Sequence, residues 1–271
     1  MALNFIKHTW QKVVLISLLS LVALVLLAAF IINWYWSPIL EGKVKTAVTE
    51  GTDGLYKIDF DHADLHILKG EIVIYDIHFR PDTVVYNLRK KQKTAPNNLT
   101  ELRVKRLVLS HIHPFKLYFK KILDIDQITL SAPQVRVSYQ LNKVKDTTVT
   151  SLTPWQKMSK TLKSAHVGRI LFNDIQFRYD DYSGKQLATS TLKDMDVRAD
   201  DLLIDSATQT DKTRLFYCKD IITNLRNYKG RTSDGSYTYT VKSLKLSTRT
   251  SRLIVEGMDI IPDKNYYAKS R

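Results

Sequence analysis

Two patterns of apolar and polar positions divide this chain. Residues Val13–Ile32 are apolar except for serine, and the run is long enough to cross a bilayer as a helix. After Ser37 the dominant pattern is strict alternation, as in Val135–Tyr139 (VRVSY). Alternation with a period of two is typical of strands with one buried and one solvated face. The sequence therefore predicts a membrane helix followed by a mainly β domain.

The apolar run has the flanks of a membrane anchor. Trp10 precedes it and Trp34–Trp36 follows it, as aromatic residues do at the two interfaces of a bilayer. A cleaved signal peptide is the alternative, but its apolar core is about 7–15 residues long and ends at small residues. Ala28 and Ala29 instead lie inside the run. We predict an N-terminal segment at 1–12, an anchor at 13–36 and one folded domain at 37–271.

Charge alone does not orient this anchor. Lys7 and Lys12 precede the apolar run, and Lys43 and Lys45 follow it. Cytoplasmic flanks carry an excess of Lys and Arg. The two sides are balanced here, so the positive residues leave both topologies open.

At least six strands are predicted after the anchor. Their apolar positions are Ile72 and Ile74, Ile77 and Phe79, Leu107 and Leu109, Ile128 and Leu130, Val135 to Tyr139, Ile175 to Tyr179, and Leu244 and Leu246. One phrase recurs, because Ile125–Tyr139 is similar to Val167–Tyr179, and fainter copies begin at Val104 and Val241. A repeated strand, turn and strand, with a turn expected at Asn173-Asp174, indicates a sheet that grows by repetition.

Helical signals are scarce in this domain. The best candidate is Pro154–Ala165, with Thr153 as N-cap and Pro154 at the first helical position. One short helix cannot cover so much sheet. The remaining apolar face must close on itself as a compact sandwich, meet another sheet, bind a partner or hold an apolar ligand.

The domain is strongly basic. The chain has 41 Lys and Arg against 27 Asp and Glu, a net charge of +14. Such a charge attracts anionic lipid headgroups, nucleic acid or another acidic polymer, and it also serves solubility. A single cysteine, Cys218, excludes an internal disulfide framework.

Lysines alternate with aromatic residues in Phe115–Lys121. Such a segment suits a membrane interface, or it stacks on the bases of a single strand. The third interpretation, which we favour for Phe115, Leu117 and Phe119, is that these side chains pack in the core. For Lys116, Lys120 and Lys121 we predict contacts with a membrane surface and none with nucleic acid.

Signals for catalysis are weak. Two histidine pairs, His111-x-His113 and His62 with His66, could be imagined as metal ligands, but no cysteine or clustered glutamate accompanies them. The carboxylate pairs Asp124-x-Asp126 and Asp194-x-Asp196 imitate those that hold a metal-bound sugar nucleotide, yet each flanks an apolar residue of an alternating segment.

Hydrolase and phosphate-binding motifs do not occur. The chain has no Gly-x-Ser-x-Gly elbow and no Gly-x-x-x-x-Gly-Lys loop. We therefore predict solvated strand faces at these histidines and carboxylates, with no catalytic residue, no metal site and no cofactor.

Two segments carry a family resemblance. Gly54–Thr83, with a turn at Lys69-Gly70, and Ile122–Tyr139, which contains Ile-x-Leu-x-x-Pro-x-Val-x-Val, follow an N-terminal membrane helix. This arrangement resembles the N-terminal part of AsmA-like proteins of Gram-negative bacteria. Members of that family are usually much longer than this chain.

The resemblance implies a relative of the bridge-like lipid transfer proteins. It places Met1 in the cytoplasm, the helix in the inner membrane and residues 37–271 in the periplasm. The implied fold is a curved, largely antiparallel β-sheet, an open groove or half-barrel, with one short helix. Phospholipid tails would lie in the groove. The residues expected to line it are Ile128, Leu130, Val135, Val137, Ile170, Phe172, Ile175, Phe177, Leu244 and Leu246.

The leading functional hypothesis is therefore non-enzymatic. The chain would hold or transfer phospholipid during envelope biogenesis, with membrane lipids and other envelope proteins as its partners. An alternative is a tethered scaffold whose sheet packs shut and whose edges recruit envelope proteins. A third hypothesis is an anchored glycan-acting enzyme that depends on Asp124 or Asp126.

Overall fold

The computed structural model describes residues 41–66, 69–142, 153–232 and 234–262. The predicted N-terminal segment and anchor, residues 1–36, lie outside this range. Within the described residues, no helix has the length and apolar character needed to span a membrane.

The described chain is mainly β, as predicted. Its strands are β1 (Tyr56–Asp59), β2 (His62–His66), β3 (Glu71–Pro81), β4 (Asn98–Ile112), β5 (Ile122–Ser131), β6 (Gln134–Tyr139), β7 (Ser164–Asp181), β8 (Ala188–Ile204), β9 (Asp220–Arg231), β10 (Tyr237–Ser247) and β11 (Arg252–Pro262). Its helices are residues 41–51, α2 (Thr83–Lys91), α3 (Pro114–Lys120), α4 (Pro154–Met158) and the 3-10 turn η2 (Thr208–Thr210).

The expectation of a single short helix was wrong. The helix predicted at 154–165 is only α4, because β7 already begins at Ser164. Its start was predicted correctly: Thr153 Oγ1 accepts a hydrogen bond from the N–H of Gln156, and the Gln156 side chain accepts one from the N–H of Thr153.

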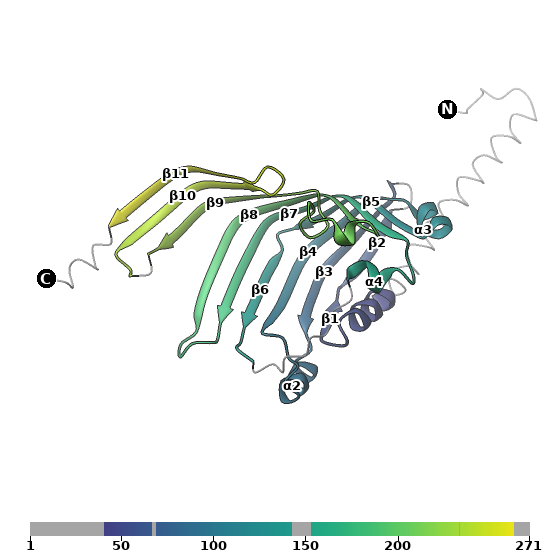
Figure 1. The fold of residues 1–271 in the computed structure, drawn as a ribbon, viewed down its shortest axis with the longest axis horizontal. Helices are drawn as coiled ribbons and strands as arrows, with labels where there is room; N and C mark the ends of the chain where they lie inside the picture. The colour runs from purple at the N-terminus through teal and green to yellow at the C-terminus, as the bar shows by residue number, and fades with distance from the viewer. Residues whose placement is uncertain (1–40, 67–68, 143–152, 233, 263–271) are drawn as a thin grey trace, which may run out of the picture.

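All eleven strands form one sheet, in the order β1-β3-β4-β5-β7-β8-β9-β10-β11. The strand β2 pairs with β3, and β6 lies between β4 and β7. Every pairing is antiparallel except those of β5 and β6 with β7. The sheet is therefore mixed, and its strands bend together into an arch (Figure 1).

The repeated phrase has a direct structural meaning. Its first copy forms β5 and β6, its second forms β7, and the two pair in parallel, Leu130 opposite Phe172 and Val137 opposite Tyr179. Pro133 separates β5 from β6 because it has no N–H to donate to a ladder. The turn predicted at Asn173-Asp174 was wrong, since β7 continues through it with an irregularity at Asp174, where φ is 55°.

A row of pairing interruptions crosses β4, β5, β7 and β8. The registers skip His111, Asp126, Gly168 and Asp201, which lie opposite one another across neighbouring strands. His111 and Asp201 have positive φ. Similar positions occur at Asp76 in β3 and at Asn227 and Gly257 in β9 and β11. Residues of this kind bend a strand and shift its alternation.

These interruptions explain apolar residues spaced three apart. Ile74 and Ile77 flank Asp76, yet both belong to one buried cluster. Leu109 and Ile112 flank His111, and both pack against the same cluster. A regular strand would point residues three apart to opposite faces.

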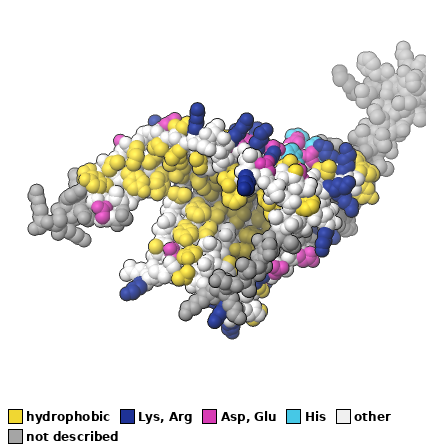
Figure 2. Space-filling view, in the orientation of Figure 1, with side chains coloured by type: hydrophobic (Ala, Val, Ile, Leu, Met, Phe, Trp, Pro, Cys, Tyr) yellow, Lys and Arg dark blue, Asp and Glu magenta, His cyan; other side chains and the backbone are white. Residues whose placement is uncertain are grey.

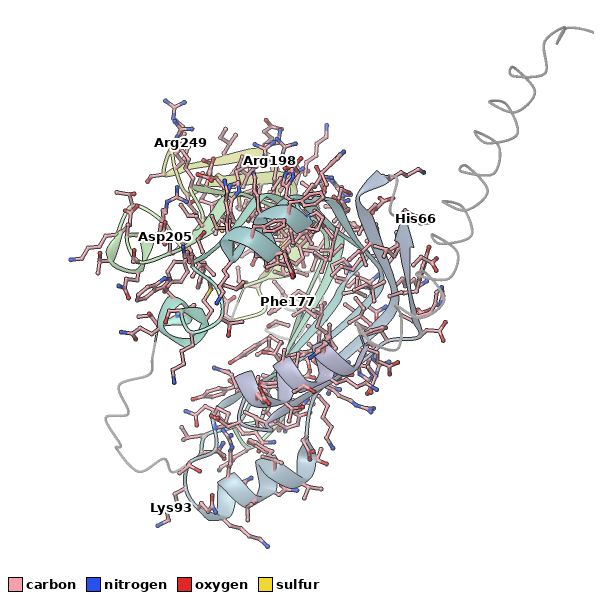
Figure 3. The ribbon with its side chains drawn as sticks, turned by 90° about the vertical axis from the view of Figure 1, so that its right-hand side faces the viewer. His66, Lys93, Phe177, Arg198, Asp205 and Arg249 are labelled. Atoms are coloured by element: carbon pink, nitrogen blue, oxygen red, sulfur yellow. The ribbon has the colours of Figure 1, made fainter. Side chains whose placement is uncertain are left out.

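The main core lies on one face of the sheet. It consists of Phe60, Ala63, Ile72, Ile74, Ile77, Val104 and Leu130. Val44 packs against this cluster, so the helix at 41–51 covers the apolar face near β2 to β5. The α2 end of the strands, with Lys93, lies opposite the end with Asp205 and Arg249 (Figure 3).

A substitution at Gly168 tests the close approach of β5 and β7 at the row of interruptions. A Cβ at this position would lie 2.7 Å from the carbonyl oxygen of Asp126 on β5. We expect Gly168→Ala to lower the free energy of unfolding by about 1–3 kcal/mol, because backbone atoms cannot move aside as a flexible side chain would. Urea unfolding of the full chain in detergent, followed by circular dichroism, measures this loss.

Gly51→Ala is the matched control. Its added Cβ would meet nothing within 4 Å. We expect it to leave stability unchanged or slightly raised. Equal unfolding curves for the two variants would contradict the close approach of β5 and β7.

Candidate functional site

The register brings the ten predicted lining residues to one face of the sheet. Side chains directly opposite each other across a ladder lie on the same face. Ile128 pairs with Ile170, Leu130 with Phe172, Val135 with Phe177, and Val137 with Tyr179. The row from Phe172 continues through Val197 and Thr223 to Leu246, and the row from Ile175 continues through Met195 and Leu225 to Leu244.

One apolar row crosses eight strands. It consists of Ile74, Leu107, Leu130, Phe172, Val197, Thr223, Leu246 and Leu253. Exposure rises along it, since Ile74 is 8% exposed, Leu246 is 40% and Leu253 is 59%. The apolar face is thus covered near β3 and open near β11. Apolar side chains follow the hollow under the arch from β11 inward (Figure 2).

The last strand adds apolar residues that the predicted site lacked. Val255, Met258 and Ile260 lie on the same face, opposite Leu244, Val241 and Tyr239 of β10. Each is between 46% and 59% exposed. Their spacing was the available signal, but the interruption at Gly257 places Met258 three residues after Val255 and hides the alternation.

The opposite face is polar and held by ion pairs between strands. Asp180 of β7 is fully buried beneath the two arginines it binds. Its carboxylate accepts hydrogen bonds from Arg136 Nε at 2.7 Å, Arg178 Nε at 2.8 Å and Thr189 Oγ1 at 2.8 Å. Burial would raise the pKa of Asp180, but these three donors outweigh it and lower the pKa to about 2.

The predicted histidine and carboxylate motifs meet on this polar face. Asp124 accepts hydrogen bonds from Lys116 and from His166 Nδ1, the latter at 2.7 Å, and His113 Nε2 lies 3.3 Å from Asp126 Oδ1. Burial alone would raise the pKa of Asp124, but the hydrogen bonds from Lys116 and His166 outweigh burial and hold that pKa below its ordinary value. Within the described ranges, no three His, Cys, Asp or Glu residues are placed to hold a metal ion.

His62 and Asp196, which belong to the other histidine pair and the other carboxylate pair, also have partners nearby. His62 Nδ1 lies 2.8 Å from Asp61 Oδ2, and its ring stacks on that of Tyr75 with centroids 4.4 Å apart. Asp196 forms an ion pair with Arg226 of β9. Both arrangements are those of solvated strand faces.

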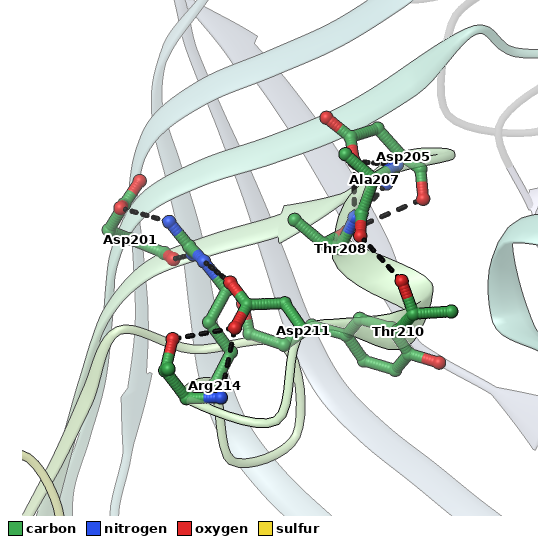
Figure 4. Close-up of polar contacts among 9 residues, drawn as sticks. Asp201, Asp205, Ala207, Thr208, Thr210, Asp211 and Arg214 are labelled. Carbon is green, nitrogen blue, oxygen red and sulfur yellow. Dashed lines mark hydrogen bonds and ion pairs between the residues drawn. The ribbon is translucent and has the colours of Figure 1, made fainter.

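One arginine fixes the loop between β8 and β9 (Figure 4). Arg214 donates from Nη2 to Asp201 Oδ2 at 2.9 Å and from Nη1 to the Asp201 carbonyl at 2.6 Å. Asp201 Oδ1 also lies 3.2 Å from His166 Nε2. The other ring nitrogen of His166 bonds to Asp124, so His166 links the loop to Asp124. These contacts tie the loop to the ends of β7 and β8.

The lysines predicted to touch a membrane lie in or next to α3: Lys116 and Lys120 belong to the helix, and Lys121 is its C-cap. This helix connects β4 to β5 and projects from the ends of the strands. Phe115 is 76% exposed, Leu117 is 37% exposed and Phe119 is 73% exposed, so the predicted core packing of these three side chains was wrong. The Lys116 ammonium binds Asp124, whereas Lys120 and Lys121 are exposed.

Comparisons with known proteins add no relative. No protein-family model matches the chain, and no curated protein is significantly similar to it. Membership of the AsmA-like family therefore stays a prediction.

The Asp180 site predicts a dependence of stability on pH. A carboxyl whose pKa falls from its ordinary 3.8 to about 2 on folding stabilises the protein above pH 3.8 and loses that contribution as the pH falls toward 2. We expect Asp180→Asn to be less stable than the parent at neutral pH, with the difference shrinking between pH 4 and 2. Urea unfolding over this pH range measures it.

Asp61→Asn is a suitable control for this series. The Asp61 side chain is 69% exposed, so its replacement should leave the curve close to that of the parent. A constant gap between Asp180→Asn and the parent at all pH values would refute the role of the Asp180 carboxylate.

Proposed function

We propose that this protein holds phospholipid by its acyl chains along the apolar face of the sheet. Anchored in the inner membrane by residues 13–36, with Met1 in the cytoplasm and residues 37–271 in the periplasm, it would serve envelope biogenesis as an AsmA-like protein. The observation that carries this proposal is the set of apolar rows that cross the sheet and end exposed at β10 and β11.

The energetics favour an apolar occupant. Burying acyl chain yields about 0.8 kcal/mol per CH₂ group, and covering Leu253, Val255 and Met258 adds to this gain. Acyl chains make no hydrogen bonds, so the site needs continuity of apolar surface and no specific polar partner. The rows provide this continuity.

The dimensions are also sufficient. A row over eight strands covers seven spacings of about 4.8 Å, or roughly 34 Å. One leaflet of a bilayer core is roughly 15 Å thick. The open half of the row, from β8 to β11, covers three of these spacings, or about 14 Å, which is close to the length of one phospholipid tail.

The proposed role is non-enzymatic. Both oxygens of Asp124 accept hydrogen bonds, from Lys116 and His166, so this carboxylate is poorly placed to hold a metal-bound sugar nucleotide. The third hypothesis, a glycan-acting enzyme, would require activity that is lost on changing Asp124 or Asp126.

Native mass spectrometry of the full chain in mild detergent tests lipid binding. We expect co-purified phospholipid in the parent and several-fold less in the double variant Leu246→Asp, Leu253→Asp, because both side chains are exposed on the apolar face. Their exposure also means that the fold should survive, which circular dichroism checks.

The matched control is Ile254→Asp. This residue is the neighbour of Leu253 and 48% exposed, but it pairs with Lys245 on the other face. We expect it to retain lipid as the parent does. Equal retention in all three proteins would contradict the proposal, since the lipid would then be bound elsewhere.

A second function is favoured by the free edge of β11. This strand pairs with β10 alone among the described strands, and all eleven of its residues are exposed. A long apolar edge can accept a strand from another envelope protein, as the scaffold hypothesis requires. A folded, lipid-free protein that binds a second polypeptide, and releases it on Ile261→Pro, would favour the scaffold over the lipid groove.

A further inference from the structure

The helix α3 displays the most exposed aromatic surface on the described chain. Tyr118 is 82% exposed, and Phe115 and Phe119 are 76% and 73% exposed. The rings contact each other, with centroids 6.4 Å apart for Phe115 and Phe119 and 5.0 Å apart for Tyr118 and Phe119. A cluster of three aromatic side chains in water is costly unless another apolar surface covers it.

We propose that α3 inserts these aromatic rings into the interface of an anionic bilayer. Lys120 and Lys121 follow the rings directly and are exposed, so they can reach lipid phosphates while the rings lie among the upper acyl groups. Each lysine near an anionic surface strengthens binding about fivefold. The contact goes beyond acyl-chain binding on the sheet and does not require it.

The structure holds α3 in place for such a contact. Pro114 occupies the first turn, and Lys121 ends the helix in the left-handed region, with φ at 57°. The Lys116 ammonium binds Asp124 of β5, which ties the helix to the sheet. Lys116 therefore has a structural role, whereas Lys120 and Lys121 face solvent.

A bilayer suits this surface better than nucleic acid. The sheet next to α3 carries Asp126, whose side chain is 56% exposed. This carboxylate would repel a phosphate backbone that lay along the sheet. A flat membrane would meet α3 at the ends of the strands without lying along the sheet.

A fluorescent reporter at Tyr118 tests the proposal. Tyr118→Cys in the full chain is labelled with the environment-sensitive dye NBD, and Cys218 is buried and spared. In vesicles of phosphatidylcholine with phosphatidylglycerol, we expect a blue-shifted emission that doxyl-labelled lipid quenches about twofold more than at the control site. Lys120→Glu with Lys121→Glu should reduce this difference.

The control site is Val84→Cys on α2. Val84 is as exposed as Phe115, at 76%, but lies at the other end of β4. Because the same anchor tethers both labelled proteins, the comparison reports only the position of α3. Equal quenching of the two labels by aqueous iodide would overturn the proposal. So would a response at Tyr118→Cys to a single-stranded oligonucleotide in place of lipid.

Discussion

The arrangement of this protein depends on a single sheet with one continuous apolar face, which the described helices cover only in part. The helix at 41–51 covers the β2 to β5 end through Val44, and the core there is well buried. No described helix lies over the side chains of β11, which are all exposed. Burial of apolar surface is the main favourable term in folding, so the open half of this face is where an external apolar ligand gains most.

The arch follows from polar residues set into apolar strands. Asp76, His111, Asp201 and Asn227 have positive φ, and the pairing skips each of them. Asn, Asp and His tolerate the left-handed region better than β-branched residues do. The side chain of Asp201 lies on the polar face, where it joins the ion pairs with Arg214 and His166. These polar residues thus bend the sheet.

Period-two alternation was sufficient to predict a mainly β chain, and it selected ten residues that the register brings to one face. The same local pattern could not give strand order, because Ile125–Leu130 carries no information about its parallel neighbour Val167–Phe172 until they are compared as repeats. The turn expected at Asn173-Asp174 was wrong for a related reason, since a positive-φ aspartate can sit within a strand as well as end one.

The candidate site was predicted in part. Leu244 and Leu246 were identified, but Met258 and Ile260 were missed because Gly257 shifts the alternation. Phe115 and Phe119 were assigned to a core by their apolar character, and only the position of α3 beyond the strand ends shows that they face solvent. Lys116 was grouped with its neighbours because its partner, Asp124, comes from the next strand.

The most direct test of lipid binding places a photo-crosslinking amino acid on adjacent residues of β11 in living cells. Val255 lies on the apolar face opposite Leu244, and Ile254 lies on the other face opposite Lys245. Illumination followed by mass spectrometry should give a phospholipid adduct at position 255 and little at position 254. Adducts of equal yield at both positions, or none at 255, would contradict the claim that the apolar face carries lipid.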